Sequence, residues 1–311
     1  MPAKKVDNRP YASAHFALEL DGRQDIGLFR SIEGGGVRAD VMQYQYGHAY
    51  ERWRSLGKPK FEDLKVQVGM AMSKPFYDWI EKFFDGDATL KNGAIVAADF
   101  HYLERARREF TNAMIKELTF PQLSAKDSTP IYMSVGISVE GMVFAPGRGI
   151  KINPGPGAAA QKEWSPNKFR FSLDGYEAAC KHISKVDSFT IKQNVIEHHV
   201  GGFRAPMKCA SQIDFPNIAF YMPESDAQPF LNQFTRRAVN GEQRTHSPNK
   251  TGYIQTYDNE GSPLFTLEFC EADIANVSFD KLDFGNEDVK QVKVEIFTER
   301  MKFTYPRYDV V

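Results

Sequence analysis

The sequence predicts a mainly β protein built from two similar antiparallel domains in tandem, each a small β-sandwich or barrel with one packed helix. Three observations support this prediction: the second half repeats the first, apolar residues often alternate with polar ones, and each half contains one amphipathic helical segment. The length of 311 residues, against a prior of roughly 150 residues for one domain, also favours two domains.

Matching residues recur in the two halves at nearly constant offsets, which is the signature of an internal repeat. Phe16–Gly22 resembles Phe169–Gly175 at an offset of 153, and Pro75-Phe76 matches Pro229-Phe230 at 154. Eight later apolar positions share the offset 159: Ile115, Leu118, Phe120, Leu123, Val135, Ile137, Met142 and Phe144 match Ile274, Val277, Phe279, Leu282, Val294, Ile296, Met301 and Phe303. We interpret this agreement as a tandem duplication.

The predicted domains are residues 1–145 and 169–311. Residues 146–168 are rich in Gly and Pro, which interrupt helices and strands, so this segment is predicted to be an extended linker.

Period-two alternation predicts the strands. Residues 131–140 alternate apolar with polar side chains, as do residues 292–296, which is typical of antiparallel strands with one buried face. Residues 253–269 are predicted to form a hairpin with a Gly-containing loop.

One helix is expected in each half. Ser73 and Pro75 begin the first before Gly86 ends it, and the second runs from near Ser225 to Gly241. The candidate core residues of the two domains are Phe76, Trp79, Ile80, Ile115, Phe120, Phe230, Phe234, Ile274 and Phe279.

Composition and charge exclude several classes of protein. With 42% apolar and 25% charged residues, the chain has enough apolar bulk for two cores and is not a disordered segment. Its 39 basic and 40 acidic residues give a net charge of −1, which argues against a surface that grips nucleic acid throughout. No secretion signal or run of about 18 apolar residues is found, so a cytoplasmic protein with reduced cysteines is expected.

The search for catalytic or metal-binding motifs finds only weak candidates. Cys180, His182, His198, His199 and Cys209 have metal-binding side chains, but their spacing matches no known zinc motif. The segment 34–36 contains three glycines without the Lys and Ser or Thr of a phosphate loop, and is predicted to be a turn or bulge. The arginines of segment 105–108 are bracketed by acidic residues and are expected on a solvated or ion-paired strand face. We therefore expect no enzyme, no cofactor and no metal.

The order and spacing of several segments resemble the tail tube proteins of contractile-tailed phages and related injection systems. In the first half the resemblance rests on these segments: Phe16–Gly22, Leu28–Gly34, Leu56–Val66, Phe76–Trp79, Phe110–Ile115 and Val139–Met142. In the second half it is looser and rests on Phe169–Gly175, Ile183–Phe189, Phe269–Ile274 and Thr298–Met301.

The resemblance implies six-fold rings in which strands of neighbouring domains join into one inner barrel, and rings that stack into a hollow tube. Residues 44–60 resemble the arm that reaches the adjacent ring, and residues 197–209 are the corresponding segment of the second half. The arm candidates are Tyr44, Tyr46, Tyr50, Trp53, Lys58, His198, His199, Phe203 and Arg204.

The family also implies partners and a location. These partners are further copies of the chain, a sheath protein, a tape-measure protein, and baseplate and terminator proteins; DNA passes through without specific binding, and no membrane is involved. The expected location is the tail of a virion or phage-like particle, assembled in the host bacterial cytoplasm.

Because two domains are fused, a trimer with pseudo-six-fold symmetry is favoured, and a hexamer of two layers is the alternative. A tube-initiator, tube-terminator or baseplate hub ring at one end of the tube is the alternative function. Two other hypotheses are a sheet-based adaptor that does not polymerise and, less favoured, a zinc enzyme using the Cys180–His199 region.

Overall fold

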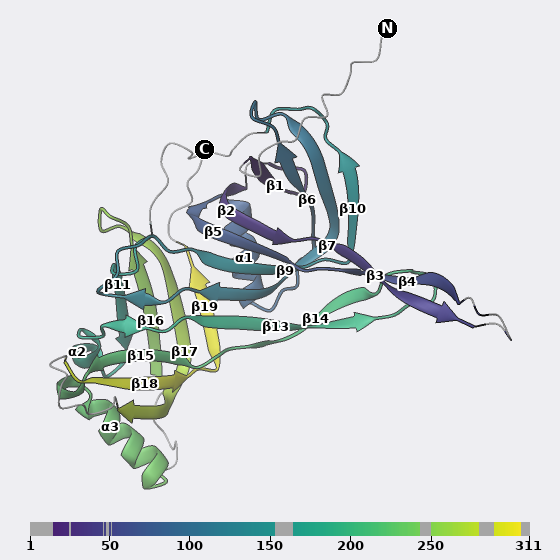
Figure 1. The fold of residues 1–311 in the computed structure, drawn as a ribbon. Coiled ribbons are helices and arrows are strands. Elements are labelled where there is room, and N and C mark those ends of the chain that lie inside the picture. The colour runs from purple at the N-terminus through teal and green to yellow at the C-terminus, as the bar shows by residue number, and fades with distance from the viewer. Residues whose placement is uncertain are drawn as a thin grey trace.

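A computed structural model describes residues 15–24, 26–45, 47, 50, 52–152, 164–242, 250–279 and 289–305 (Figure 1). The protein is mainly β, and all strand pairs are antiparallel within the described ranges. The predicted fold class is confirmed. Of the predicted linker, residues 153–163 lie outside the described part of the chain.

The first half follows the alternation of its sequence closely. On strand β9, Met133, Val135 and Ile137 are buried, because successive side chains of a strand point to opposite faces. The elements of this half are β1 (Phe16–Leu20), β2 (Gly27–Gly34), β3 (Val37–Tyr44), β4 (Trp53–Phe61), β5 (Leu64–Met72), α1 (Lys74–Phe84), β6 (Lys91–Ala98), β7 (Glu104–Phe120), β8 (Leu123–Ser124), β9 (Met133–Ser138) and β10 (Gly141–Pro146).

Helix α1 forms where the sequence predicts it. Pro75 lies in its first turn, where the missing N–H has no helical partner to lose. The helix buries one stripe, formed by Phe76, Tyr77, Trp79, Ile80, Phe83 and Phe84. Gly86, with φ of 77°, adopts the left-handed conformation just after the helix ends.

The second half contains the predicted helix in a shorter form. The helix α3 covers Gln228–Phe234 and continues as one π-helical turn, Thr235–Val239. The remaining elements are β11 (Phe169–Leu173), α2 (Glu177–Cys180), β12 (Lys185–Val186), β13 (Phe189–His198), β14 (Met207–Asp214), β15 (Ile218–Pro223), β16 (Lys250–Tyr257), β17 (Pro263–Phe279), β18 (Gln291–Phe297) and β19 (Arg300–Thr304).

The two halves have the same strand order. The sheet path β1-β6-β7-β9-β5-β2 is repeated as β11-β16-β17-β18-β15-β12, and the last strands, β10 and β19, pair with β7 and β17. The registers repeat as well, since Phe144 is opposite Arg108 and Phe303 is opposite Leu267, both at an offset of 159.

The hairpins β3–β4 and β13–β14 also correspond to each other, at an offset of 154. Arg38 is opposite Lys60 as Lys192 is opposite Asp214. The register shifts after Ala39 in one hairpin and after Gln193 in the other, again 154 residues apart. A bulge conserved between two hairpins marks them as equivalent parts of the fold.

Among the described residues, one large apolar cluster runs through both halves. A small one formed by Ala17, Ala94, Val96, Ala98 and Ile152 lies on the other face of the first sheet. Seven of the nine core candidates, namely Phe76, Trp79, Ile80, Ile115, Phe120, Phe230 and Ile274, are buried. Phe234 is only partly buried against the cluster. Phe279 is 52% exposed, so its assignment to the core is wrong for the isolated chain. The equivalent Phe120 is buried because the second half covers it, whereas no described segment covers Phe279 in this way.

No helix in the described ranges is long and apolar enough to cross a membrane.

Phe303→Ala is expected to destabilise the chain by about 3–5 kcal/mol, because it leaves a cavity where helix α1 meets strand β19. The measurement is urea unfolding. Phe100→Ala, the same truncation at a side chain that is 80% exposed, serves as the control. If Phe303→Ala lowers the free energy of unfolding no more than the control does, the described packing is contradicted.

Candidate functional site

Strand β13 of the second half adds to the edge of strand β7 of the first half. Phe189, Thr190, Ile191 and Lys192 are opposite Phe120, Thr119, Leu118 and Glu117 in antiparallel register. The hydroxyls of Thr119 and Thr190 lie 2.9 Å apart and hydrogen-bond to each other. The short strands β8 and β12 pair beside this contact. We call this contact between the halves the internal joint.

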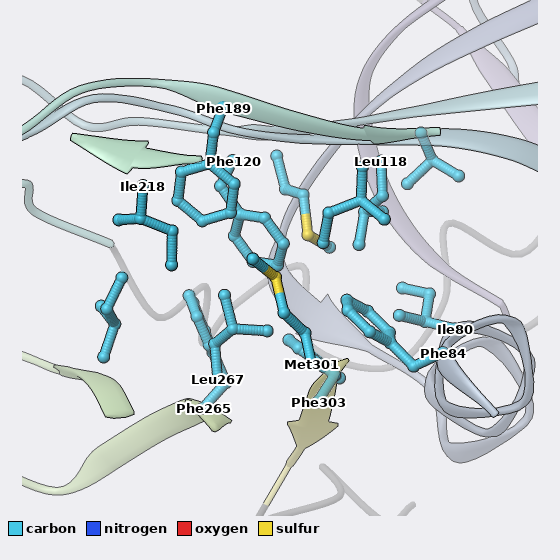
Figure 2. Close-up of a cluster of buried hydrophobic side chains, with 14 of the residues drawn as sticks. Ile80, Phe84, Leu118, Phe120, Phe189, Ile218, Phe265, Leu267, Met301 and Phe303 are labelled. Carbon is cyan, nitrogen blue, oxygen red and sulfur yellow. The ribbon is translucent and has the colours of Figure 1, made fainter. Parts of the chain in front are cut away.

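Apolar side chains from both halves fill the internal joint (Figure 2). Phe120 lies 5.2 Å from Phe189 and 6.3 Å from Phe303, measured between ring centroids. Phe303 also stacks on Phe84 of helix α1 at 5.9 Å. Because Phe84 and Phe120 belong to one half and Phe189 and Phe303 to the other, the halves share one core rather than touching at their surfaces.

Two tyrosines extend the same contact. Tyr77 of α1 stacks on Tyr305, which follows β19, with 3.6 Å between ring centroids. Both hydroxyls donate hydrogen bonds to the carbonyl oxygen of Met70, at 3.0 Å and 3.1 Å. Buried hydroxyls without acceptors would be costly, so this shared carbonyl satisfies both phenols at the joint.

A polar cluster beside the joint connects the base of strand β5 to strand β14. The Nζ atom of Lys116 lies 2.8 Å from Oδ2 of Asp63, and the Ser138 hydroxyl donates to Oδ1 at 2.7 Å. Lys208 of the second half donates from Nζ to Ser138 at 2.8 Å and from its backbone N to Oε1 of Glu140 at 2.5 Å.

The electrostatics of this polar cluster favour the ionised form of Asp63. Burial raises the pKa of the Asp63 carboxyl, but the hydrogen bonds from Lys116 and Ser138 and the nearby lysine charges outweigh burial and lower its pKa. The Lys116 ammonium is affected in the opposite direction, since its bond to Asp63 raises its pKa. Each shift reflects the same ion pair, which holds the end of β7 to the base of the β3–β4 hairpin.

The arm candidates lie on the two hairpins or their loops. Of the candidates in the first half, Tyr44, Tyr50, Trp53 and Lys58 are exposed, and Tyr46 is outside the described residues. Of those in the second half, His198, His199, Phe203 and Arg204 are exposed. Figure 1 shows both hairpins projecting toward the same side of the molecule. A hydrogen bond from Arg204 to the carbonyl oxygen of Gly57, at 3.4 Å, connects them.

Apolar side chains on the β3–β4 hairpin face solvent. Val41, Leu56 and Trp53 are 57%, 65% and 71% exposed. A monomeric protein rarely leaves such a cluster uncovered, so the hairpin has the character of a contact surface.

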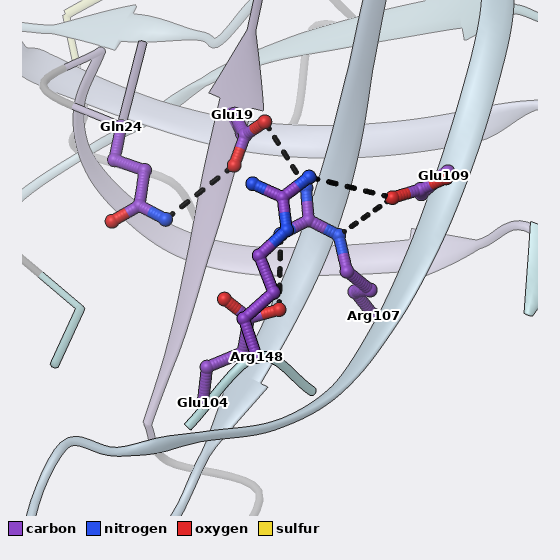
Figure 3. Close-up of polar contacts among 6 residues, drawn as sticks. All are labelled: Glu19, Gln24, Glu104, Arg107, Glu109 and Arg148. Atoms are coloured by element: carbon purple, nitrogen blue, oxygen red, sulfur yellow. Dashed lines mark hydrogen bonds and ion pairs between the residues drawn. The ribbon is translucent and has the colours of Figure 1, made fainter. Parts of the chain in front are cut away.

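Arg107 of the segment 105–108 forms ion pairs as expected, but the expectation that it lies at the surface is wrong. This side chain is only 3% exposed and lies between Glu19, at 3.0 Å, and Glu104, at 2.9 Å (Figure 3). Its Nε is also 2.9 Å from Glu109, as an ion pair rather than a directed hydrogen bond. Burial lowers the pKa of Arg107, but the bonds to Glu104 and Glu19 outweigh it and raise that pKa. Glu19 reaches Arg107 only because of the strand order, in which β6 pairs with β1 on one side and with β7 on the other.

The candidate metal-binding residues do not form a site. His182 lies 3.0 Å from Asp226, and burial raises the pKa of the Cys180 thiol to about 12, so that thiol stays protonated. Within the described residues, no group of three or more His, Cys, Asp or Glu side chains could hold a metal ion.

Comparison with known families supplies the remaining observation. Residues 12–143 match the family model described as T4-like virus tail tube protein gp19. The first half therefore resembles the tail tube proteins of this family. This family is structural and non-enzymatic, which confirms the prediction that the chain is not an enzyme. The model does not cover the second half, so the match by itself does not show the duplication.

Three solved structures each match a little under half of the chain. A chain of the anti-feeding prophage baseplate is 18% identical, with a TM-score of 0.33 over 44% of this chain and 91% of its own length. A chain of the anti-feeding prophage tube-terminating cap is 14% identical, with a TM-score of 0.38 over 47% and 94%. A chain of the PVC extracellular contractile injection system, in its extended sheath-tube complex, is 16% identical, with a TM-score of 0.34 over 44% and 88%. No curated protein sequence matches the chain.

Asp63→Asn is expected to lower the stability of the chain by about 1 kcal/mol at pH 7, a value reduced because the carboxylate is partly exposed. The folded-state pKa of Asp63 lies below its unfolded value of 3.8. The stabilisation is therefore complete above that value and is lost as the pH falls through the folded pKa.

Urea unfolding of the parent chain and of Asp63→Asn, at pH 7 and at acid pH, measures this difference in stability. The control is Asp85→Asn, at an exposed carboxylate. Equal stability of Asp63→Asn and the parent chain at pH 7 would contradict the prediction.

Arg107→Met is expected to cost about 3–5 kcal/mol, because it leaves the buried carboxylates of Glu19 and Glu104 without their cation. The matched control is Arg148→Met, which removes an exposed guanidinium 3.7 Å from Glu109. Urea unfolding at neutral pH compares the two variants. Similar losses of stability in the two variants would contradict the prediction that the buried ion pairs of Arg107 stabilise the fold.

Proposed function

We propose that the chain is a structural subunit of the tail tube of a phage or phage-like contractile particle, in which its two halves fill two neighbouring positions of one ring. The observation that carries this proposal is the internal joint. There, β13 of the second half extends the sheet of the first half beyond β7, so that strands of two domains make one continuous surface. Sheets joined in this way close a ring without leaving unpaired edges.

We further propose that the second half is a duplicated tail tube domain. The matching strand order, the offsets of 154 and 159 in the strand registers, and the bulge repeated in both hairpins support this proposal. The proposed domain boundaries are residues 1–145 and 169–311, with residues 146–168 as the linker.

Three chains would supply six domains, so the preferred assembly is a trimer with pseudo-six-fold symmetry; a hexamer of chains in two layers is the alternative. In either case the same contact, between two different surfaces, is repeated around an axis. Such a contact makes a closed ring only if the repeated rotation brings the last subunit back to the first. The exposed apolar hairpins β3–β4 and β13–β14 are proposed to contact the next ring.

A conduit should not hold the DNA that passes through it. On the polar face of β12, β15 and β18, Lys185 lies 2.9 Å from Asp187, and Lys293 lies 2.8 Å from Glu295. Lysines paired with carboxylates attract phosphate less than free lysines do. We propose that this face lines the channel, which then passes DNA, or another cargo, without specific binding. The sheath, the tape measure and the baseplate or terminator proteins are the proposed partners.

Imaging of the purified full-length chain tests the proposed function. We expect rings with an open centre by negative-stain microscopy, and a trimer mass of about 106 kDa, three times the 35.3 kDa chain, by light scattering. Growth into tubes would assign the tube body, and rings that never stack would assign an end ring. A monomer across all protein concentrations would contradict the proposal.

A further inference from the structure

The internal joint connects one surface of the first half with one surface of the second half. Each half also contains the equivalent of the other half's surface, and in the described residues these two equivalents are not joined to each other. In the joint, the first half provides α1 and the end of β7, and the second half provides the start of β13 and strand β19. The equivalents of the first set are α3 and the end of β17, Asn276–Phe279. The equivalents of the second set are the start of β3 and strand β10.

We propose that these two open surfaces bind each other between two copies of the chain. The inference rests on the proposed ring assembly and assigns the residues that make its contact. The end of β17 of one copy pairs with the start of β3 of a second copy, so that Asn276 is opposite Arg38 and Val277 is opposite Val37. These pairs correspond to Glu117 opposite Lys192 and Leu118 opposite Ile191 in the internal joint.

Both strand stretches have a free side in the described part of the chain. The end of β17 pairs with β18 along Asp273–Phe279, and no other described strand pairs with that stretch. Strand β3 pairs with β4 alone in the same ranges, whereas its equivalent, β13, pairs with both β14 and β7. A strand edge of this kind readily accepts a strand from another chain.

Two exposed phenylalanines fit this contact. Phe279 is 52% exposed and Phe144 is 61% exposed, although their equivalents Phe120 and Phe303 are 4% and 1% exposed. In the internal joint those equivalents lie 6.3 Å apart between ring centroids. Joining two copies in the same way would bring Phe279 of one against Phe144 of the other and remove both from water.

A carboxylate that accepts a backbone hydrogen bond recurs at the same place. The internal joint has Lys208 bound to Glu140 through its backbone N. The residues at equivalent positions are Arg54, on β4, and Glu299, between β18 and β19. Because the bond in the internal joint uses a backbone N–H, Glu299 of one copy can accept the same hydrogen bond from the backbone N of Arg54 in another copy.

The test is a disulfide between copies. In a chain with Cys209→Ser, which removes the exposed native thiol, Arg38→Cys and Asn276→Cys are combined, since both side chains are exposed and would lie directly opposite each other. Mild oxidation should give covalent dimers and trimers on a non-reducing gel. The control combines Arg38→Cys with Val277→Cys, because a shift of one residue places the thiols on opposite faces. This control should lose the cross-linked product.

A second variant tests the aromatic contact without cysteines. Phe144→Asp should keep the thermal unfolding of the monomer but abolish assembly, whereas Phe100→Asp, at another exposed aromatic residue, should assemble normally.

The outcomes separate the two proposals. Rings that form while the aligned cysteines fail to cross-link, or while Phe144→Asp still assembles, would overturn this interface and leave the proposed function intact. A chain that forms no assembly under any condition would overturn both.

Discussion

The structure depends on the backbone pairing between strands β7 and β13. Four consecutive residues of each strand take part, and they bring a strand edge of the first half against a hairpin of the second. An unpaired edge within an apolar core would leave N–H and C=O groups without partners, which is costly. Pairing within one chain satisfies this edge and fixes how the two halves lie relative to each other.

Side-chain packing between the two halves further stabilises their relative position. Phe120 and Phe303 come from different halves, yet each is buried in the same cluster, and Tyr77 stacks on Tyr305 across the same boundary. Apolar packing of this kind provides stability, and the polar cluster of Asp63, Lys116 and Lys208 provides register, because its partners must meet at particular atoms. The two halves therefore behave as one body built from two similar domains.

Much of this fold follows from the sequence, because local rules determine it. The alternation of apolar and polar residues predicted the buried face of β9. The apolar stripe through Phe76, Trp79 and Ile80 predicted helix α1 and its buried side. The repeat offset of 159 also predicted equivalent registers for β10 and β19.

Contacts between distant segments could not be predicted in the same way. Nothing local indicates that Arg107 is buried between Glu19 and Glu104, since this needs strand β1 to lie near β7. Phe279 has the same chemistry as Phe120, and only the position of each domain in the chain decides which one is covered. The sequence therefore predicts the equivalent residues but not which of them has its partner within the same chain.

The most direct measurement is a density map of the assembled particle in which the contact between chains is compared with the contact inside one chain. We expect the two contacts to superpose, with α3 and β17 of one copy packed on β10 and β3 of the next as α1 and β7 pack on β19 and β13. A particle whose chains meet through other surfaces, leaving Phe144 and Phe279 in solvent, would contradict it.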